Sequence, residues 1–213
     1  MKKYVFIYFL FILCSISCIK EELPIPAHVS GDIKLDQVEM GANYNTQIFY
    51  NLDYASIVSN NLETDWEIAF ECSDSGSNII LNSSIVCSAY NTNSTNFDSI
   101  YSDSGIQSSD WKYDANEGNL DSTAINIDSN NYVYLINLGT SVSDLGAERG
   151  YKKLIIYHTN DQKNQLRYAD LNGENDTTVT IYKDSDFNFL AYSLTTNTVI
   201  DVFPFKNNWD IMF

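Results

Sequence analysis

The sequence feature that most constrains the fold is a short motif that occurs twice. WEIAF at residues 66–70 returns as WDIMF at residues 209–213. Each copy follows an aromatic-rich segment, residues 47–52 for the first and 188–194 for the second, and the copies align with a single inserted residue. Because a repeat defines the structural unit, the pattern predicts one unit that begins near residue 40 and another that begins near residue 184.

Residues 183–213 are interpreted as the beginning of a second, truncated repeat. The same alternation of apolar residues imposes the same inward face, so residues 188–213 should repeat the geometry of residues 47–70. A strand that stops in mid-pattern leaves an unpaired edge and an uncovered apolar face. We therefore expect this segment to dock loosely on the first domain or to fray.

The N-terminus has the layout of a secretory signal peptide. Basic residues 2–3 precede an apolar run at residues 4–13, which is too short to span the roughly 30 Å of a bilayer core. Ser17 then stands directly before Cys18, as at bacterial lipoprotein cleavage sites, where the cysteine becomes the lipidated first residue. We expect a signal peptide at residues 1–17, acylation of Cys18 and a flexible, proline-bearing tether at residues 18–36.

Two alternatives to this processing remain open. Cys14 is a rival lipidation site, although the bulky Leu13 before it suits that cleavage poorly. The other alternative is an uncleaved anchor helix. The lipid bilayer is the expected partner of acylated Cys18, and the outer membrane or cell surface is the expected location.

Composition narrows the classes of partner and fold. The formal net charge is −16 and the pI is about 4.2, which argues against nucleic acid because such binding relies on Lys and Arg at phosphates. A solvated, repulsive exterior explains the charge, and an acidic site for a cationic ligand is the alternative. With 15 Tyr and 11 Phe, the chain favours strands over helices.

Apolar residues recur with the period of two that is typical of β-strands. In residues 66–72, Trp66, Ile68 and Phe70 should point inward and Glu67 and Glu71 outward. The fold class is all-β, an antiparallel meander domain at residues 37–182, with one short helical turn near residues 143–148. The predicted strands are residues 47–52, 66–72, 78–81, 85–90, 132–138, 151–158, 165–169 and 177–182.

Two cysteines lie within the predicted domain, Cys72 and Cys87. Both fall on the apolar parity of their strands. If the chain turns again near residues 82–84, the two lie two strands apart, roughly 9–10 Å, whereas a disulfide needs Cα atoms within about 7 Å. We expect two buried thiols.

The motifs together resemble the HmuY family of haem-binding-type outer-membrane lipoproteins of Bacteroidetes. The resemblance rests on the Trp motif, on YKKL at residues 151–154 followed by LRYADLNG at residues 166–173, on residues 189–199 leading to Trp209, and on the lipoprotein leader. It covers most of residues 37–213. It implies haem held between two axial side chains and a TonB-dependent receptor as partner.

This sequence departs from the family where the two axial histidines are expected. Residues 71–131 contain neither His nor Met, and haem iron needs such side chains on facing elements. His158, at the end of a strand, is a weak candidate ligand and is more simply explained as a rim histidine. His28 falls in the tether. Met40 and Met212 are interpreted as core gap-fillers.

Residues 170–176 (DLNGEND) alternate oxygen-bearing side chains around a glycine, as half a calcium loop does. A hairpin turn with Gly173 at positive φ explains the segment better, so no metal site is predicted. No catalytic motif occurs, and the protein is interpreted as non-enzymatic. We expect a surface lipoprotein that binds haem or another small nutrient for a partner transporter; the alternative is a non-haem structural, glycan-binding or protein-interaction lipoprotein.

Overall fold

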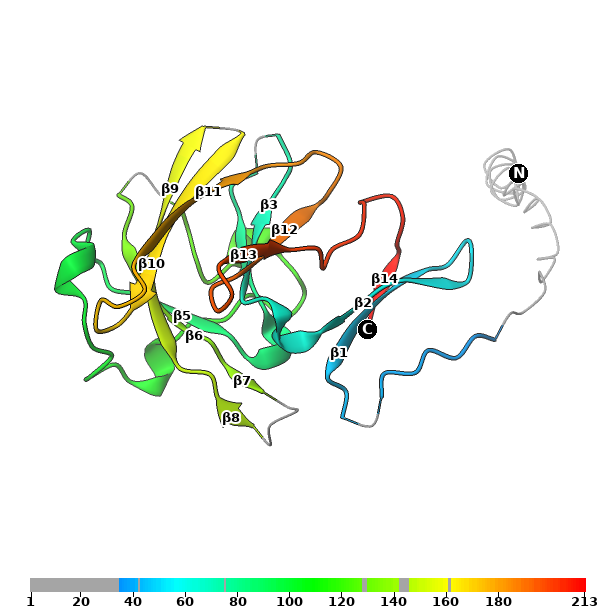
Figure 1. Ribbon diagram of the computed structural model, residues 1–213, viewed down its shortest axis with the longest axis horizontal. Helices are drawn as coiled ribbons and strands as arrows, with labels where there is room; N and C mark the ends of the chain where they lie inside the picture. Colours follow the sequence, from blue (N-terminus) through cyan, green and yellow to red (C-terminus); the bar gives the residue numbers. More distant parts are fainter. Residues whose placement is uncertain (1–34, 42, 75, 128–129, 142–145, 161) are drawn as a thin grey trace, which may run out of the picture. The chain divides into compact units, whose positions relative to one another are not determined.

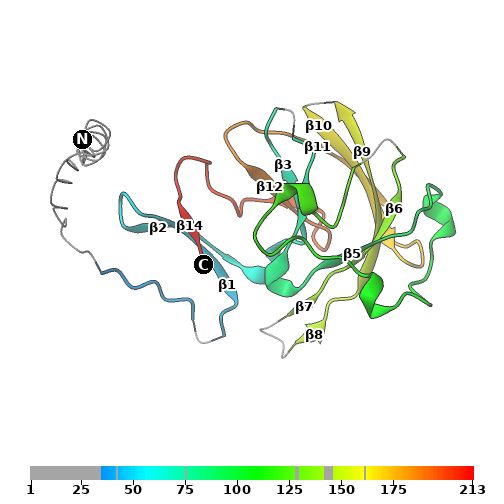
Figure 2. The same ribbon diagram turned by 180° about the vertical axis from the view of Figure 1, so that it is seen from behind.

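The structure, a computed structural model, describes residues 35–213 apart from positions 42, 75, 128–129, 142–145 and 161. The predicted leader, Cys18, most of the tether and His28 lie outside the described residues. Residues 37–213 form one compact unit, built of antiparallel strands and short 3-10 turns (Figures 1 and 2). The prediction of an all-β, antiparallel fold is confirmed.

A five-stranded sheet in the order β11-β10-β9-β6-β5 forms one layer of this unit. Strands β9, β10 and β11 follow one another antiparallel, so the predicted meander is confirmed. Strand β5 begins later than expected because residues 83–85 form a 3-10 turn capped by Asn82. The bounds are β5 Ser88–Asn91, β6 Val133–Asn137, β9 Tyr151–Asn160, β10 Lys163–Asp170 and β11 Thr177–Tyr182.

Two smaller sheets contain the repeated motif. The four-stranded sheet has the order β13-β12-β3-β4, and the three-stranded sheet has the order β14-β1-β2. Their bounds are β1 Thr46–Asn51, β2 Ser56–Leu62, β3 Ile68–Glu71, β4 Ile79–Leu81, β12 Phe189–Ser193, β13 Thr198–Ile200 and β14 Ile211–Met212. A short ribbon pairs β7 (Thr140–Ser141) with β8 (Ala147–Glu148). Extended β8 therefore occupies part of the predicted helical turn.

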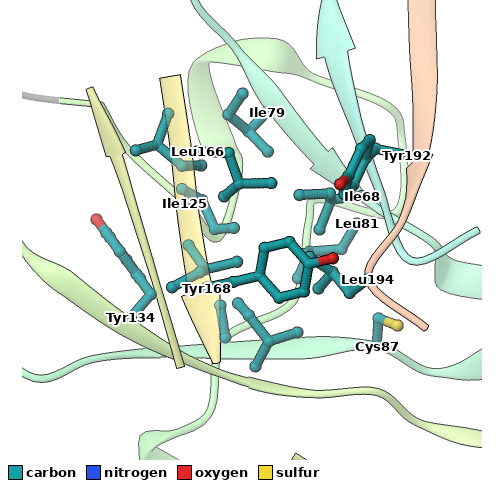
Figure 3. Packing of buried hydrophobic residues seen from close by; sticks show 14 of the residues in the cluster. Ile68, Ile79, Leu81, Cys87, Ile125, Tyr134, Leu166, Tyr168, Tyr192 and Leu194 are labelled. Carbon is teal, nitrogen blue, oxygen red and sulfur yellow. The ribbon is translucent and has the colours of Figure 1, made fainter. Parts of the chain in front are cut away.

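The largest core lies between the five-stranded and four-stranded sheets (Figure 3). Strand β3 contributes Ile68 and Phe70, and β12 contributes Tyr192, all buried. The opposite sheet supplies Tyr134, Leu166 and Tyr168 among others. Facing apolar residues of two sheets thus interdigitate as in a β-sandwich.

A second core lies on the other face of the four-stranded sheet. It contains Phe49 of β1, Ala69 of β3 and Ala191 of β12, together with Trp66 and Phe203. Trp66 is buried as predicted, but it precedes β3 and packs here rather than beside Ile68 and Phe70.

The prediction that Glu67 points outward is wrong. Glu67 is 0% exposed and its Oε1 lies 2.5 Å from Nη2 of Arg149. Because both faces of this sheet are covered, the inward–outward alternation of a half-exposed strand does not apply.

The polar tract at residues 91–127 begins on the outer face of the five-stranded sheet, at Phe97, and ends at the main core, which Ile125 enters. It forms three 3-10 turns, η3 (Phe97–Ser99), η4 (Ser108–Asp110) and η5 (Leu120–Ser122), and two isolated bridges to β4 and β5. Phe97 packs on Val133 and Ile155 in a small third core. The tract is therefore a long excursion that the buried side chains of Phe97 and Ile125 attach to the folded cores.

The two copies of the motif exchange partners. The aromatic strand of the second copy, β12, pairs with β3, and that of the first copy, β1, pairs with β14. Tyr192 lies opposite Ile68, and its counterpart Tyr50 lies opposite Ile211. The two pairings have the same register. We call each copy, with its aromatic strand and its Trp motif, a half-unit; the two half-units cross and are related by internal pseudo-two-fold symmetry.

Hydrogen bonds repeat the same symmetry. The Leu194 amide donates to Oε2 of Glu67 at 2.7 Å, and the Leu52 amide donates to Oδ2 of Asp210 at 2.8 Å. The acidic residue of each motif thus accepts from the backbone that follows the opposite aromatic strand.

Residues 183–213 consequently belong to the same compact unit as residues 37–182, and the domain boundary expected at residue 183 falls inside it. Loose docking is not what is seen for β12, whose Ala191 and Tyr192 are buried. Strand β14 differs, because Ile211, Met212 and Phe213 are 38%, 47% and 45% exposed. A second repeat that continues the chain stays a prediction.

Candidate functional site

An aromatic cleft of about 580 Å³ lies beside the second core. Its apolar wall comes from both half-units: β4 contributes Ile80, whereas the chain around β12 and β14 contributes most of the rings. The apolar lining residues are Ile80, Leu120, Phe187, Phe189, Phe203, Trp209 and Met212. A concave, mainly apolar site with few polar groups is the usual form of a small-molecule pocket.

Phe203 fixes the floor of the cleft. Its ring centroid lies 5.4 Å from that of Trp66, 5.6 Å from that of Phe49 and 5.9 Å from that of Phe189. Two of these contacts are edge-to-face, an arrangement that aromatic pairs prefer. The floor is therefore rigid and part of the folded core.

The rim of the cleft is more open. Phe187 stacks at 4.9 Å on Phe205, and both rings are at least partly exposed. Met212, which the sequence analysis interpreted as a core gap-filler, is 47% exposed and lines the cleft. That interpretation was wrong, because Met212 faces the open cleft rather than a packed core. The rim is therefore accessible to a ligand at Phe187 and Met212.

Trp209 stands at the cleft edge-on to Phe49, with ring centroids 4.9 Å apart. Its buried Nε1 has no hydrogen-bond partner among the residues that the structure describes. The corresponding nitrogen of Trp66 donates to Oε1 of Gln47 at 2.8 Å. In the repeat, Phe189 takes the position of Gln47, so the second copy has exchanged an internal acceptor for an aromatic wall.

The polar side of the cleft carries an excess of negative charge. Glu71, Asp74 and Lys206 are the charged residues of its lining, and Nζ of Lys206 donates to the Ser185 carbonyl at 2.7 Å. Burial would raise the pKa of Glu71, but hydrogen bonds from Ser73 and Asn78 outweigh it and lower the pKa. Glu71 is therefore a carboxylate at neutral pH and is fully engaged by its own hairpin.

The thiol in the cleft lining is that of Cys72. Burial raises the pKa of this thiol, and its Sγ lies 3.6 Å from the Phe70 carbonyl. Burial also raises the pKa of Cys87, which lies in the main core. Both cysteines are free and buried, so the predicted pair of buried thiols is confirmed. A protonated thiol is a poor nucleophile and a poor metal ligand.

His158 does not contribute to the cleft. It lies exposed near the end of β9, and its Nδ1 is 3.1 Å from Oδ1 of Asn164. The lining of the aromatic cleft does not include His158. The position fits the rim histidine described from the sequence, and its proposed role as a ligand stays untested.

The carboxylates of the turn at residues 170–176 are bonded to side chains of the turn and of the adjoining strands. Asp170 accepts from Nζ of Lys152 at 2.5 Å and from Nδ2 of Asn175 at 2.6 Å, and Arg167 pairs with Asp176. Gly173 has a φ of 88°, as the hairpin interpretation requires. Among the described residues, no three or more His, Cys, Asp or Glu side chains gather as a metal site would need.

The cleft does not fit a haem held between two axial side chains. Of the side chains that ligate haem iron, its lining offers only the Met212 thioether and the Cys72 thiol, and the thiol is kept protonated by burial. A facing pair of soft or imidazole donors is missing from the described lining. The lack of axial ligands noted for residues 71–131 of the sequence is thus not made up for by the lining of the cleft.

Among the residues that the structure describes, no helix has the length and apolar character needed to cross a bilayer. No curated protein and no solved structure shows a significant match to the chain. The family model described as HmuY protein matches residues 43–198, which is more than half of the chain. The matched range runs from the start of the first half-unit into β13 and includes both sheets of the main core. The chain therefore belongs to the HmuY family, a family associated with haem binding and uptake rather than with enzymatic activity.

Proposed function

We propose that the protein is a non-enzymatic, surface-anchored binding protein that captures a small, apolar, ring-bearing molecule in the aromatic cleft. The observation that carries the proposal is the cleft itself: a volume of about 580 Å³ with Phe187, Phe189, Phe203 and Trp209 in its walls. Stacking on such rings favours a flat, apolar ligand. Family membership supports nutrient capture for a partner outer-membrane transporter, the TonB-dependent receptor implied by the resemblance.

Haem in its two-ligand form is not supported by the donor set of the cleft. A structural or protein-interaction role would need no cleft of this kind, and it is the alternative if ligand binding fails. The ligand is therefore recognised by its shape, through stacking on the aromatic rings. If the ligand is a metalloporphyrin, coordination of its iron contributes little to the affinity.

Binding is tested with N-phenyl-1-naphthylamine, a neutral fluorescent aromatic probe. We expect one probe molecule per chain and a twofold to tenfold loss of affinity, roughly, for Phe187→Ala, since an aromatic contact contributes about 0.5–1.5 kcal/mol. Tyr101→Ala is the matched control, because Tyr101 is 74% exposed and lies outside the cleft lining. Isothermal titration calorimetry gives the stoichiometry.

Competition by haem and by iron-free protoporphyrin then addresses the metal. Comparable displacement by the two agrees with recognition by shape. A six-coordinate Soret spectrum that disappears in His158→Ala would place the haem elsewhere and contradict the assignment to the cleft.

Anchoring is the second part of the proposal. Processing before Cys18 and acylation of its thiol would tether the folded unit through residues 18–36. Since one acyl chain gives only marginal attachment, stable anchoring requires several chains. We expect Cys18→Ala to move the protein from the membrane fraction to the soluble fraction, measured by fractionation and mass spectrometry of the N-terminus. Cys14→Ala is the control and should leave attachment intact; retention of an uncleaved Cys18→Ala chain would support the anchor helix.

A further inference from the structure

We propose that the outer face of the three-stranded sheet β14-β1-β2 is a docking surface for a second β-sheet, of the same five-stranded meander type that covers the corresponding face of β12-β3. The occupant presents an apolar sheet face and packs face to face. The proposal is independent of the cleft, because the cleft lies on the inner side of the same strands.

The pseudo-two-fold symmetry identifies the face. On β3 and β12, Ile68, Phe70, Tyr192 and Leu194 all point into the main core and are at most 2% exposed. Their covering layer is the five-stranded sheet. Because the register of the two strand pairs is identical, the residues that correspond to these four are Ile211, Phe213, Tyr50 and Leu52.

Three of these four counterparts are open to solvent. Leu52 is 58% exposed, Phe213 45% and Ile211 38%. Tyr50 is covered, with its ring centroid 6.4 Å from that of Phe213. On the neighbouring strand, Ile57 opposite Tyr50 is 50% exposed and Val199 opposite Tyr192 is 46% exposed, so the two half-units differ in the cover of β1 and β14 and not in that of β2. An apolar sheet face has to be buried against another element, and contiguous exposed apolar patches mark interaction sites.

The repeat also says what kind of layer fits. The same residue types at the same register, Ile-x-Phe opposite Tyr-x-Leu, already pack against Tyr134, Leu166 and Tyr168 of the meander. Sheet-on-sheet packing depends on the side chains of the two faces that meet and on the spacing of about 10 Å between the sheets. A layer built like β5-β6-β9-β10-β11 therefore matches the open face as it matches the covered one.

The inner face of the same strands lines the second core and the cleft. Phe49 of β1 and Ala69 of β3 alternate with the outer residues and meet in the second core, which both half-units share. The shared core holds the crossed strands together, whereas each outer face needs a covering layer of its own. One of the two covers is present among the described residues.

The experiment extends the full chain by repeating its own residues 71–182 directly after Phe213, the position that corresponds to Phe70. We expect the appended strands to fold onto the open face, with amide exchange slowed by about a hundredfold or more relative to an unfolded chain. We also expect less binding of 8-anilinonaphthalene-1-sulfonate than in the unextended chain. Phe213→Lys in the extended chain should abolish both effects, whereas Leu35→Lys, at a 97% exposed site outside the face, should leave them.

Circular dichroism of the unextended Phe213→Lys chain shows whether the first unit still folds, which the exposure of Phe213 leads us to expect. Unprotected appended strands in the unsubstituted chain would overturn the proposal, as would protection that survives Phe213→Lys. Dimerisation of the unextended chain that Phe213→Lys abolishes would also overturn it, because the occupant would then be a second copy.

Discussion

Replacement of Trp66 by alanine is expected to lower the free energy of unfolding by about 3–5 kcal/mol, the range for large buried aromatic side chains. Trp66 is 3% exposed and packs against Phe203. Its loss also removes the donor to Gln47, and a buried polar group left unpaired adds about 1–3 kcal/mol of cost. Urea denaturation followed by circular dichroism measures the change.

Two further variants separate packing from hydrogen bonding. Trp66→Phe keeps most of the ring and removes the N–H, so it should cost less than Trp66→Ala. Trp209→Ala is the matched comparison, because Trp209 occupies the same motif position, is only partly buried and has no acceptor among the described residues. A loss below about 1.5 kcal/mol for Trp66→Ala, outside that range, would show that the second core does not depend on Trp66.

Period-two alternation was sufficient to find most strands but not the sheet that each one joins. Strands β1, β3, β9, β10 and β11 lie within one or two residues of their predicted positions. Strand β2 was missed because SIVSNNL is mostly exposed and polar, and β7, β8 and β13 are only two or three residues long. Short or solvent-facing strands are set by their partners rather than by their own sequence.

The crossed pairing could not be read from local pattern. The repeat predicted that both copies share one geometry, and they do, but it left open whether an aromatic strand pairs with the motif of its own copy. Tertiary contacts decide this: Phe49 and Ala191 meet in one shared core only when the strands cross. For the same reason Glu67, outward by alternation, is buried beneath a second layer.

The cleft was missed because its aromatic residues were assigned to a separate second repeat. A signal was present, since aligning the copies sets Gln47 against Phe189 and so leaves Trp209 without the acceptor that Trp66 has. This difference between the copies marks the segment from Phe189 to Trp209 as the place where the second half-unit departs from a purely structural role.

Removal of the cation that faces Glu67 is the other change with a large expected effect. Arg149→Met should lower the free energy of unfolding by about 3–5 kcal/mol, because it leaves a buried carboxylate without its partner. The side chains of Arg149 and Glu67 are 14% and 0% exposed. Arg149 also donates to the Thr64 and Leu138 carbonyls at 3.0 Å and 3.2 Å, so it ties the segment before β3 to the end of β6.

The double variant Glu67→Gln/Arg149→Met tests whether the cost lies in the unpaired charge. The glutamine oxygen still accepts from the Leu194 amide, and its NH2 group can donate to the Thr195 hydroxyl oxygen in place of the bond that this hydroxyl now donates to Glu67, so much of the lost stability should return. Asp210→Asn is the control from the other half-unit: Asp210 is exposed and forms no salt bridge with the residues that the structure describes, and its change should cost about 1 kcal/mol or less. An Arg149→Met chain as stable as the parent, or a double variant no better than the single one, would mean that hydrogen bonds rather than the buried charge set the energetics here. The two motif acids would then be equivalent in energy as well as in geometry, although only one of them lies between two covered faces.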